Sequence, residues 1–223
     1  PFIFGAIAAS VIFIFAFVSF SIYKLIKLIV QTGKFSRRYL VHVKRKHSAK
    51  LKQTLADLNF NKNRIVEVRD SRPVVFCFGL WNPKICISNG LIKILSRDEL
   101  EAVLLHENSH MIAKEPIKLF VIKLFYSIFF FLPGIKTYVN KYITFSELAA
   151  DELATNNFSD RLKLARAIFK ISQEEEKHLL RSELALSFFT STIAERVNKL
   201  SDNNYVPKFR IWGKEFLLRL CSA

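Results

Sequence analysis

Residues 2–23 form an apolar stretch without a charged side chain. As a helix that rises 1.5 Å per residue, about 20 such residues cross the hydrocarbon core of a bilayer. A cleaved signal peptide is the alternative, but it carries positive charge before a shorter apolar stretch, whereas here the positive charge follows. The pattern therefore predicts a transmembrane anchor helix over residues 1–32.

A basic stretch follows the apolar one. Ten lysine and arginine side chains lie between residues 24 and 52. Positive charge gathers on the cytoplasmic side of membrane segments, so we expect the chain from residue 24 onward to lie in the cytoplasm. We interpret residues 33–62 as a solvated basic juxtamembrane segment.

The pattern then changes to one typical of strands followed by a helix. "RIVEV" and "KICIS" alternate, and "VVFCF" is a short apolar run. The loop "GLWNP" between the last two suits a hairpin. Ser96 and Glu99 form a capping-box pattern, which predicts the start of a helix that runs through His106 and His110. Residues 63–116 are therefore predicted to form a small β-sheet packed beside this helix.

A second apolar stretch spans residues 117–132 and is interrupted by Lys118 and Lys123. Pro133 and Gly134 break a helix directly after it. A single crossing would carry the following residues to the other side of the membrane. We instead predict a membrane hairpin over residues 117–146, which returns the chain to the level of His110.

The remaining chain completes an α+β integral membrane protein that is mainly helical. We expect residues 147–200 to form the helical part of the domain and residues 201–223 a C-terminal tail. The protein is either multi-pass or combines the anchor with a re-entrant hairpin, and its functional site is expected at the cytoplasmic face.

The composition agrees with a membrane protein. Hydrophobic residues make up 51% of the chain, and the mean hydropathy is +0.20, which is more apolar than a typical soluble enzyme. The net charge of +15 therefore favours anionic lipid headgroups, and we see no nucleic-acid-binding motif. Membrane lipid, and no nucleic acid, is the expected partner. The cysteines, Cys77, Cys86 and Cys221, form no Cys-x-x-Cys pair, which argues against a disulfide framework or a cysteine zinc site.

The predicted helix carries His106, Glu107 and His110 in the order His-Glu-x-x-His. Histidines four residues apart share a helix face and can direct their imidazoles at one metal ion. Zinc lowers the pKa of a bound water to about 7, and a carboxylate beside it can accept the proton as that water attacks a carbonyl. Glu107 suits this role. The motif is short and also occurs by chance, so the hypothesis needs a third ligand.

"SELAAD" supplies two carboxylates four residues apart on a predicted helix, Glu147 and Asp151. Glu147 would complete a His-His-Glu set, and Asp151 would hydrogen-bond a ligand histidine and fix its tautomer. The alternative is two carboxylates on a solvated helix face. The hairpin decides between them, because only a returning chain brings Glu147 back to His106.

In their order and spacing, these pieces resemble the BlaR/MecR-type membrane metallopeptidases. The resemblance covers residues 72 to 200 and rests on "FGLWNPKICISNGLI", "LSRDELEAVLLHENSH", an acidic residue and Pro116 before the second apolar stretch, "SELAAD" and "ERVNKL". It implies a gluzincin-type domain that holds one zinc ion per chain, with the residues His106, Glu107, His110, Glu147 and Asp151 in the roles given above. Glu115 and Ala150 depart from the family's more common Asp and Cys, and neither change removes a ligand.

The related prenyl-protein and heat-shock membrane peptidases share both motifs and are the second choice. They often carry a histidine six positions before the late arginine, where this chain has Thr190. The late arginine, Arg196, is expected to contact the site carboxylates or a developing oxyanion. The alternative is that Arg196 forms only a salt bridge at the surface.

A protein or peptide substrate is expected to pair with the edge of the small sheet. Zinc peptidases of this general fold hold an extended substrate in this way, through main-chain hydrogen bonds. Pro73 cannot donate a ladder bond, which suits an edge strand directly after it. The predicted edge comprises Val74, Val75, Phe76, Cys77 and Phe78, and the alternative is a central strand that only packs.

Two functions stay open on these observations. The first is a membrane zinc endopeptidase, with a role in regulatory proteolysis by family analogy. The second is a catalytically silent signalling or scaffold subunit that keeps the fold. Because Glu107 and every expected ligand are present, we favour the enzyme.

Overall fold

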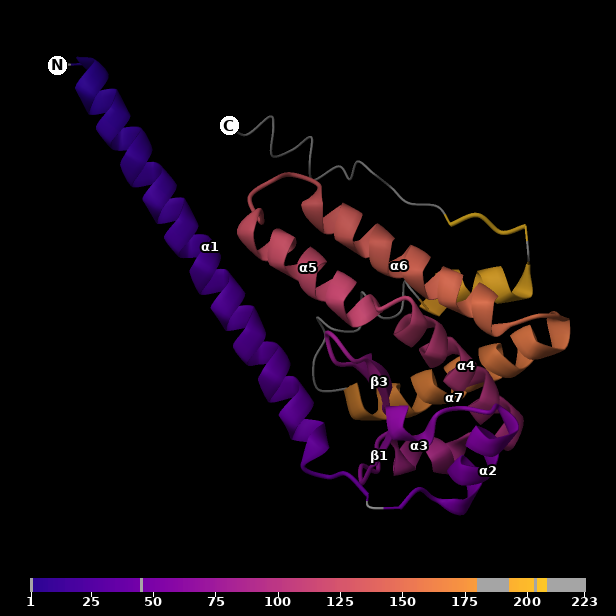
Figure 1. Ribbon diagram of the computed structural model, residues 1–223. Coiled ribbons are helices and arrows are strands. Elements are labelled where there is room, and N and C mark those ends of the chain that lie inside the picture. Colours follow the sequence, from indigo (N-terminus) through magenta and orange to yellow (C-terminus); the bar gives the residue numbers. More distant parts are fainter. Residues whose placement is uncertain (1, 45, 180–192, 203, 208–223) are drawn as a thin grey trace.

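The computed structural model describes residues 2–44, 46–179, 193–202 and 204–207. Most of the predicted C-terminal tail (208–223), including Cys221, lies outside the described residues, as does Thr190. A long helix, α1 (Phe2–Leu40), extends away from a mainly helical body that contains a small three-stranded sheet (Figure 1). The predicted mainly helical fold with a small sheet is confirmed.

Helix α1 continues through the apolar stretch and well into the basic one. Among the described residues it is the one helix long and apolar enough to cross a membrane, with a mean hydropathy of 2.5 and none of that apolar window buried. The helix passes residue 32 without a break, because the lysine, leucine and isoleucine residues that follow the apolar stretch are compatible with a helix. It therefore links the expected anchor directly to the folded body.

Part of the basic segment belongs to the core. Helix α2 (Ala49–Asp57) buries Leu51, Thr54 and Leu55 on one face. The connection before it is fixed by the buried carboxylate of Glu67, which accepts hydrogen bonds from the Lys44 ammonium at 2.8 Å and the Ser48 backbone N–H at 2.7 Å. The prediction of a solvated segment is therefore wrong for α2. The apolar residues of α2 alternate with lysines in the sequence but lie together on one buried face of the helix.

The sheet has the strand order β1-β3-β2. Strand β1 (Ile65–Val68) runs parallel to β3 (Lys84–Ser88), and β2 (Val75–Phe78) runs antiparallel to β3 with Phe76 opposite Cys86. Within the part of the chain that the structure describes, β2 lies at an edge of the sheet as predicted and is not a central strand. Val74 lies just before the strand and accepts a hydrogen bond from the Ser88 backbone N–H at 2.9 Å.

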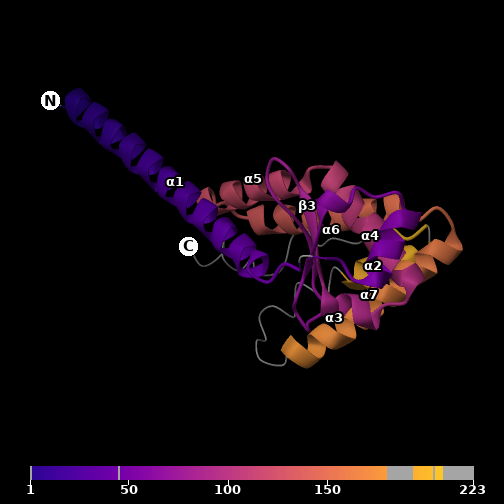
Figure 2. The same ribbon diagram turned by 60° about the horizontal axis from the view of Figure 1, so that its bottom comes forward.

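Helix α4 (Arg97–Ile112) forms the centre of the body. It follows the short helix α3 (Asn89–Ile94) and begins with the predicted capping box of Ser96 and Glu99. Its apolar face, including Leu100 and Leu104, lies in the hydrophobic core. Figures 1 and 2 both place the sheet between α4 and the end of α1, where Phe35 and Tyr39 contact Phe76 at ring distances of 5.0 and 4.9 Å.

The chain turns back between residues 117 and 146 as predicted, and the insertion of this hairpin in a membrane stays a prediction. Helices α5 (Glu115–Ile128) and α6 (Ile135–Ala154) lie side by side and are joined by a turn containing Pro133 and Gly134 (Figure 1). Gly134 has φ of 83°, a left-handed conformation that favours glycine. Because α6 returns toward α4, its C-terminal half lies at the functional site. Helix α7 (Phe158–Leu179) and the helical residues 193–201 then cover α4.

Candidate metal centre

Helix α4 presents its two histidines from a buried position. His106 and His110 are 5% and 8% exposed, one helical turn apart on the face that meets α6. Their Nε2 atoms lie 3.0 Å apart. The apolar residues before them bury this end of the helix, so the histidines are not ordinary surface residues.

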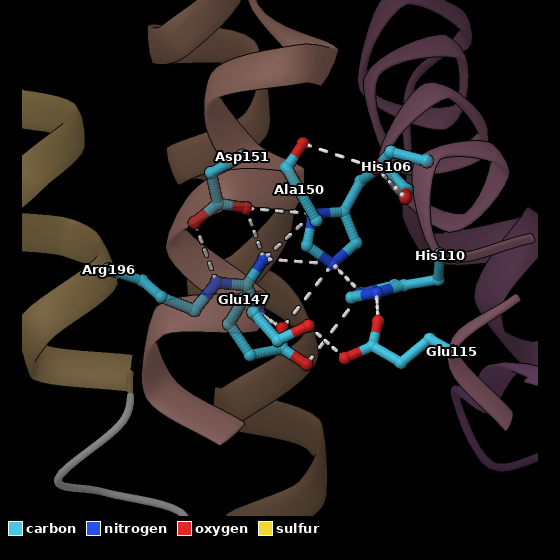
Figure 3. A network of polar contacts seen from close by, with 9 residues as sticks. His106, His110, Glu115, Glu147, Ala150, Asp151 and Arg196 are labelled. Carbon is cyan, nitrogen blue, oxygen red and sulfur yellow. Dashed lines mark hydrogen bonds and ion pairs between the residues drawn. The ribbon is translucent and has the colours of Figure 1, made fainter. Parts of the chain in front are cut away.

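The returning helix α6 brings Glu147 to the same point. Its carboxylate oxygens lie 3.4 Å from Nε2 of His106 and 3.7 Å from Nε2 of His110. One ligand atom from each of the three side chains lies within 4.8 Å of the others. Figure 3 shows the three side chains converging, which brings together the predicted ligand set.

A carboxylate holds the other nitrogen of His106. Nδ1 of His106 lies 2.8 Å from Oδ1 of Asp151, which is 2% exposed. Asp151 also accepts two hydrogen bonds from the guanidinium of Arg196, at 2.8 and 2.7 Å. Arg196 reaches Glu147 as well, at 3.0 Å. The predicted contact of Arg196 with the site carboxylates is therefore observed, and the alternative of a surface salt bridge is wrong.

A second carboxylate, which the sequence reasoning missed, holds His110. Nδ1 of His110 bonds the buried carboxylate of Glu115, and the Ser146 hydroxyl donates to the other oxygen of that carboxylate. Glu115 reaches back because Lys114 adopts a left-handed conformation, with φ of 52°, between α4 and α5. The signal in the sequence that could have indicated this role is the position of Glu115, an acidic residue five positions after His110 and directly before Pro116.

The charges around the ligand atoms alter their titration. Burial lowers the pKa of His106, but hydrogen bonds to its carboxylate partners outweigh burial and raise the pKa to about 9. Burial raises the pKa of Glu147, yet the hydrogen bond to His106 and the Arg196 charge outweigh it and lower the pKa to about 2. Burial also raises the pKa of Glu107, although the neighbouring histidine charges oppose it. Among the described residues, four carboxylates and one guanidinium gather at this site, an excess of negative charge that favours a cation.

The donor set fits a zinc ion. Because Nδ1 of each histidine faces a carboxylate, each ring can donate a hydrogen bond from Nδ1 and keep Nε2 for a metal ion, and the two Nε2 atoms lie 3.0 Å apart. Zinc–nitrogen bonds of about 2.0–2.1 Å in a tetrahedral site separate two ligand atoms by about 3.3 Å. The observed separations of 3.0, 3.4 and 3.7 Å are close to this value.

A cavity of about 310 Å³ opens beside the ligand atoms. Glu107 lines it together with the ligands, and Pro73, Val75, Phe76 and Cys77 border it from the sheet. Burial raises the pKa of the Cys77 thiol to about 12, which makes it a packing residue rather than a nucleophile. The cavity thus joins the metal centre to the edge strand.

The comparisons with known proteins agree with this site. A family model for the BlaR1 peptidases, M56, matches residues 5–200, which include every residue of the candidate metal centre. The chain belongs to the BlaR1 peptidase M56 family. A search of the curated proteins found no match. Membership of the M56 family confirms the resemblance to the BlaR/MecR type, and it makes the chain a member of a family of membrane-associated metallopeptidases.

Proposed function

We propose that the protein is a membrane-anchored zinc endopeptidase whose site faces the cytoplasm. The observation that carries this proposal is the convergence of His106, His110 and Glu147, with each histidine held by its own carboxylate, at a cavity bordered by β2. The outer edge of β2 pairs with no other strand among the described residues. A bound zinc ion would supply a Lewis acid and an activated water. A role in regulatory proteolysis rests on family analogy alone.

Glu107 is the general base in this proposal. It is 7% exposed and lines the cavity. Because burial raises its pKa, its carboxylate holds a proton more readily than an exposed glutamate does. It can therefore take a proton from the attacking water and pass it to the leaving amine.

The remaining polar residues orient the site. Asp151 and Glu115 fix the tautomers of the two histidines, so that Nε2 of each ring faces the metal position. Arg196 holds both Glu147 and Asp151 in the ionised state and fixes their position. Glu147 thereby keeps its oxygens directed at the histidines.

The free edge of β2 is proposed to hold the substrate. In an antiparallel pair, hydrogen-bonded residues alternate with residues whose backbone groups point away. Since Val74 bonds Ser88, the pairing predicts the same inward orientation for Phe76 opposite Cys86. Val75 and Cys77 therefore direct their backbone N–H and C=O groups to the free edge, beside the cavity that both residues line. An extended peptide paired there would place a carbonyl near the metal centre.

Substitution of the base tests this proposal. Glu107→Gln should retain zinc, because Glu107 is not a ligand, and should lower kcat for hydrolysis of unfolded casein by about 10²- to 10⁴-fold. Glu101→Gln, on the same helix but outside the cavity lining, is the matched control and should keep full activity. Undiminished hydrolysis by Glu107→Gln would refute the mechanism. Absence of hydrolysis in the zinc-loaded natural protein would instead favour the silent scaffold.

A further inference from the structure

The distal part of the α5–α6 hairpin is apolar but has little protein around it. Glu115 is the one buried residue of α5, and Thr144 is the first of α6. The apolar side chains exposed between them are Val121, Phe125, Tyr126, Phe130, Phe131, Leu132 and Tyr138. An apolar surface of this extent marks contact with a membrane or another protein.

The tip of the hairpin lies beside the expected membrane helix. The Phe129 ring is 6.1 Å from the Phe17 ring, and the Phe130 ring is 6.4 Å from the Phe20 ring. The Lys24 ammonium lies 5.6 Å from the centre of the Phe130 ring. The tip therefore lies alongside residues 17–24 of α1.

These contacts fix how deep the tip reaches. Lys24 is the first charged residue after the apolar stretch, so its ammonium belongs among the lipid headgroups. Phe17 lies about 10 Å farther along the helix. The hydrocarbon core is about 30 Å thick. The tip thus enters about a third of the core and stays within one leaflet.

The lysines of the hairpin limit how deep it can lie in the bilayer, independently of its contacts with α1. Lys123 is exposed near the middle of α5, and Lys136 is exposed in the first turn of α6, beside the tip. A lysine can extend its ammonium toward the headgroups by only the length of its side chain. A hairpin that reached the bilayer centre would leave both ammonium groups in hydrocarbon.

We infer that the α5–α6 hairpin is a single-leaflet wedge, with residues 129–132 inserted in the cytoplasmic leaflet. Glu115 lies at the other end of α5, about 20 Å from the tip, so the metal centre remains outside the hydrocarbon. Peptide bonds are then cleaved in water beside the headgroups and not within the bilayer. This inference rests on the membrane-anchored orientation in the proposed function, but not on catalysis.

Depth-dependent fluorescence quenching tests the wedge. The full chain, with Trp81 and Trp212 replaced by Phe, is reconstituted in vesicles of phosphatidylcholine and phosphatidylglycerol that carry bromine at either shallow or deep acyl positions. Phe131→Trp places the probe at the tip, and Leu132→Trp repeats the measurement if the first variant misfolds. Phe13→Trp, about 16 Å from Lys24 along α1, is the mid-bilayer control. Ile112→Trp, which is 71% exposed beside the metal centre before substitution, reports the position of the site.

The expected result is that shallow bromine quenches the tip probes at least twofold more than deep bromine, with the reverse order for Phe13→Trp. Deep bromine should not quench Ile112→Trp. Deep quenching of the tip equal to that of Phe13→Trp would overturn the wedge, because the hairpin would then reach the bilayer centre. No quenching at the tip would also overturn it and would assign the apolar face to a protein partner. Neither outcome depends on hydrolysis. Failure of the wedge can therefore be distinguished from failure of the peptidase proposal.

Discussion

Two carboxylates from different elements hold the two histidines of the metal centre. Asp151 comes from α6, where it is four residues from Glu147, whereas Glu115 begins α5. Each fixes one imidazole, so the ligand geometry depends on residues that do not touch the metal position. Such supporting residues generally change metal affinity when they are lost.

Removal of the Glu115 carboxylate should therefore weaken zinc binding. Glu115→Ala leaves Nδ1 of His110 without its partner, and we expect the zinc dissociation constant to rise about 10- to 100-fold. Competition with a chelator measures this change. Glu101→Ala removes a half-buried carboxylate of α4 that pairs with Arg97 and does not line the cavity, and is the control. Zinc binding by Glu115→Ala at the strength of the natural protein would show that Glu115 does not orient the ligand.

Zinc binding should also release a proton from His106. With a pKa raised to about 9, His106 carries a proton at pH 7 in the metal-free protein, and zinc can bind Nε2 only after that proton leaves. Zinc affinity should rise about tenfold per pH unit from pH 7 to 9 and level off above that range. Titration calorimetry in two buffers with different ionisation enthalpies counts the proton. An affinity that does not change between pH 7 and 9 would contradict this account.

At the scale of the elements, the proposed role of the β2 edge leads to a prediction for a single backbone group, the N–H of Cys77. Cys77→Pro removes a backbone N–H that points away from β3, which an edge strand tolerates. We expect the variant to fold and bind zinc, but to raise KM by up to about tenfold through the loss of one substrate hydrogen bond. Cys77→Ala keeps the N–H and is the matched control. An unchanged KM for Cys77→Pro would exclude this edge as the substrate site.

Several elements could be predicted from the sequence because their signals are local. The capping box of Ser96 and Glu99 fixes the start of α4, Pro133 and Gly134 end α5, and Pro73 marks an edge strand. The burial of α2 could not be predicted in the same way. Its apolar residues are spaced on one helix face but are interleaved with lysines that read as solvated surface.

The parts of the site that the sequence left open or missed depend on tertiary structure. The contact of Arg196 with the site carboxylates was expected, but a surface salt bridge stayed open as the alternative, because Arg196 and Asp151 are 45 positions apart and sequence spacing does not distinguish the two. Glu115 reaches His110 only because the backbone turns at Lys114. Its burial follows from the position of α6, which supplies Ser146, and no local pattern encodes that position.

At the scale of the whole molecule, the three candidate metal ligands come together only because the hairpin returns. His106 and His110 precede it on α4, whereas Glu147 follows it on α6. A chain that crossed the membrane once would separate the ligands by a bilayer. If metal binding depends on Glu147, then Glu147 is a ligand and the chain returns to the side of the membrane that holds His106 and His110.

The zinc content of the purified full chain, measured by mass spectrometry, tests this claim most directly. Glu147→Ala removes the third ligand, and Glu152→Ala removes an exposed carboxylate from the same helix as the control. The account predicts about one zinc ion per chain in the natural protein and in Glu152→Ala, and a content far below that in Glu147→Ala. A natural protein without zinc, or a Glu147→Ala variant that retains the full content, would contradict it.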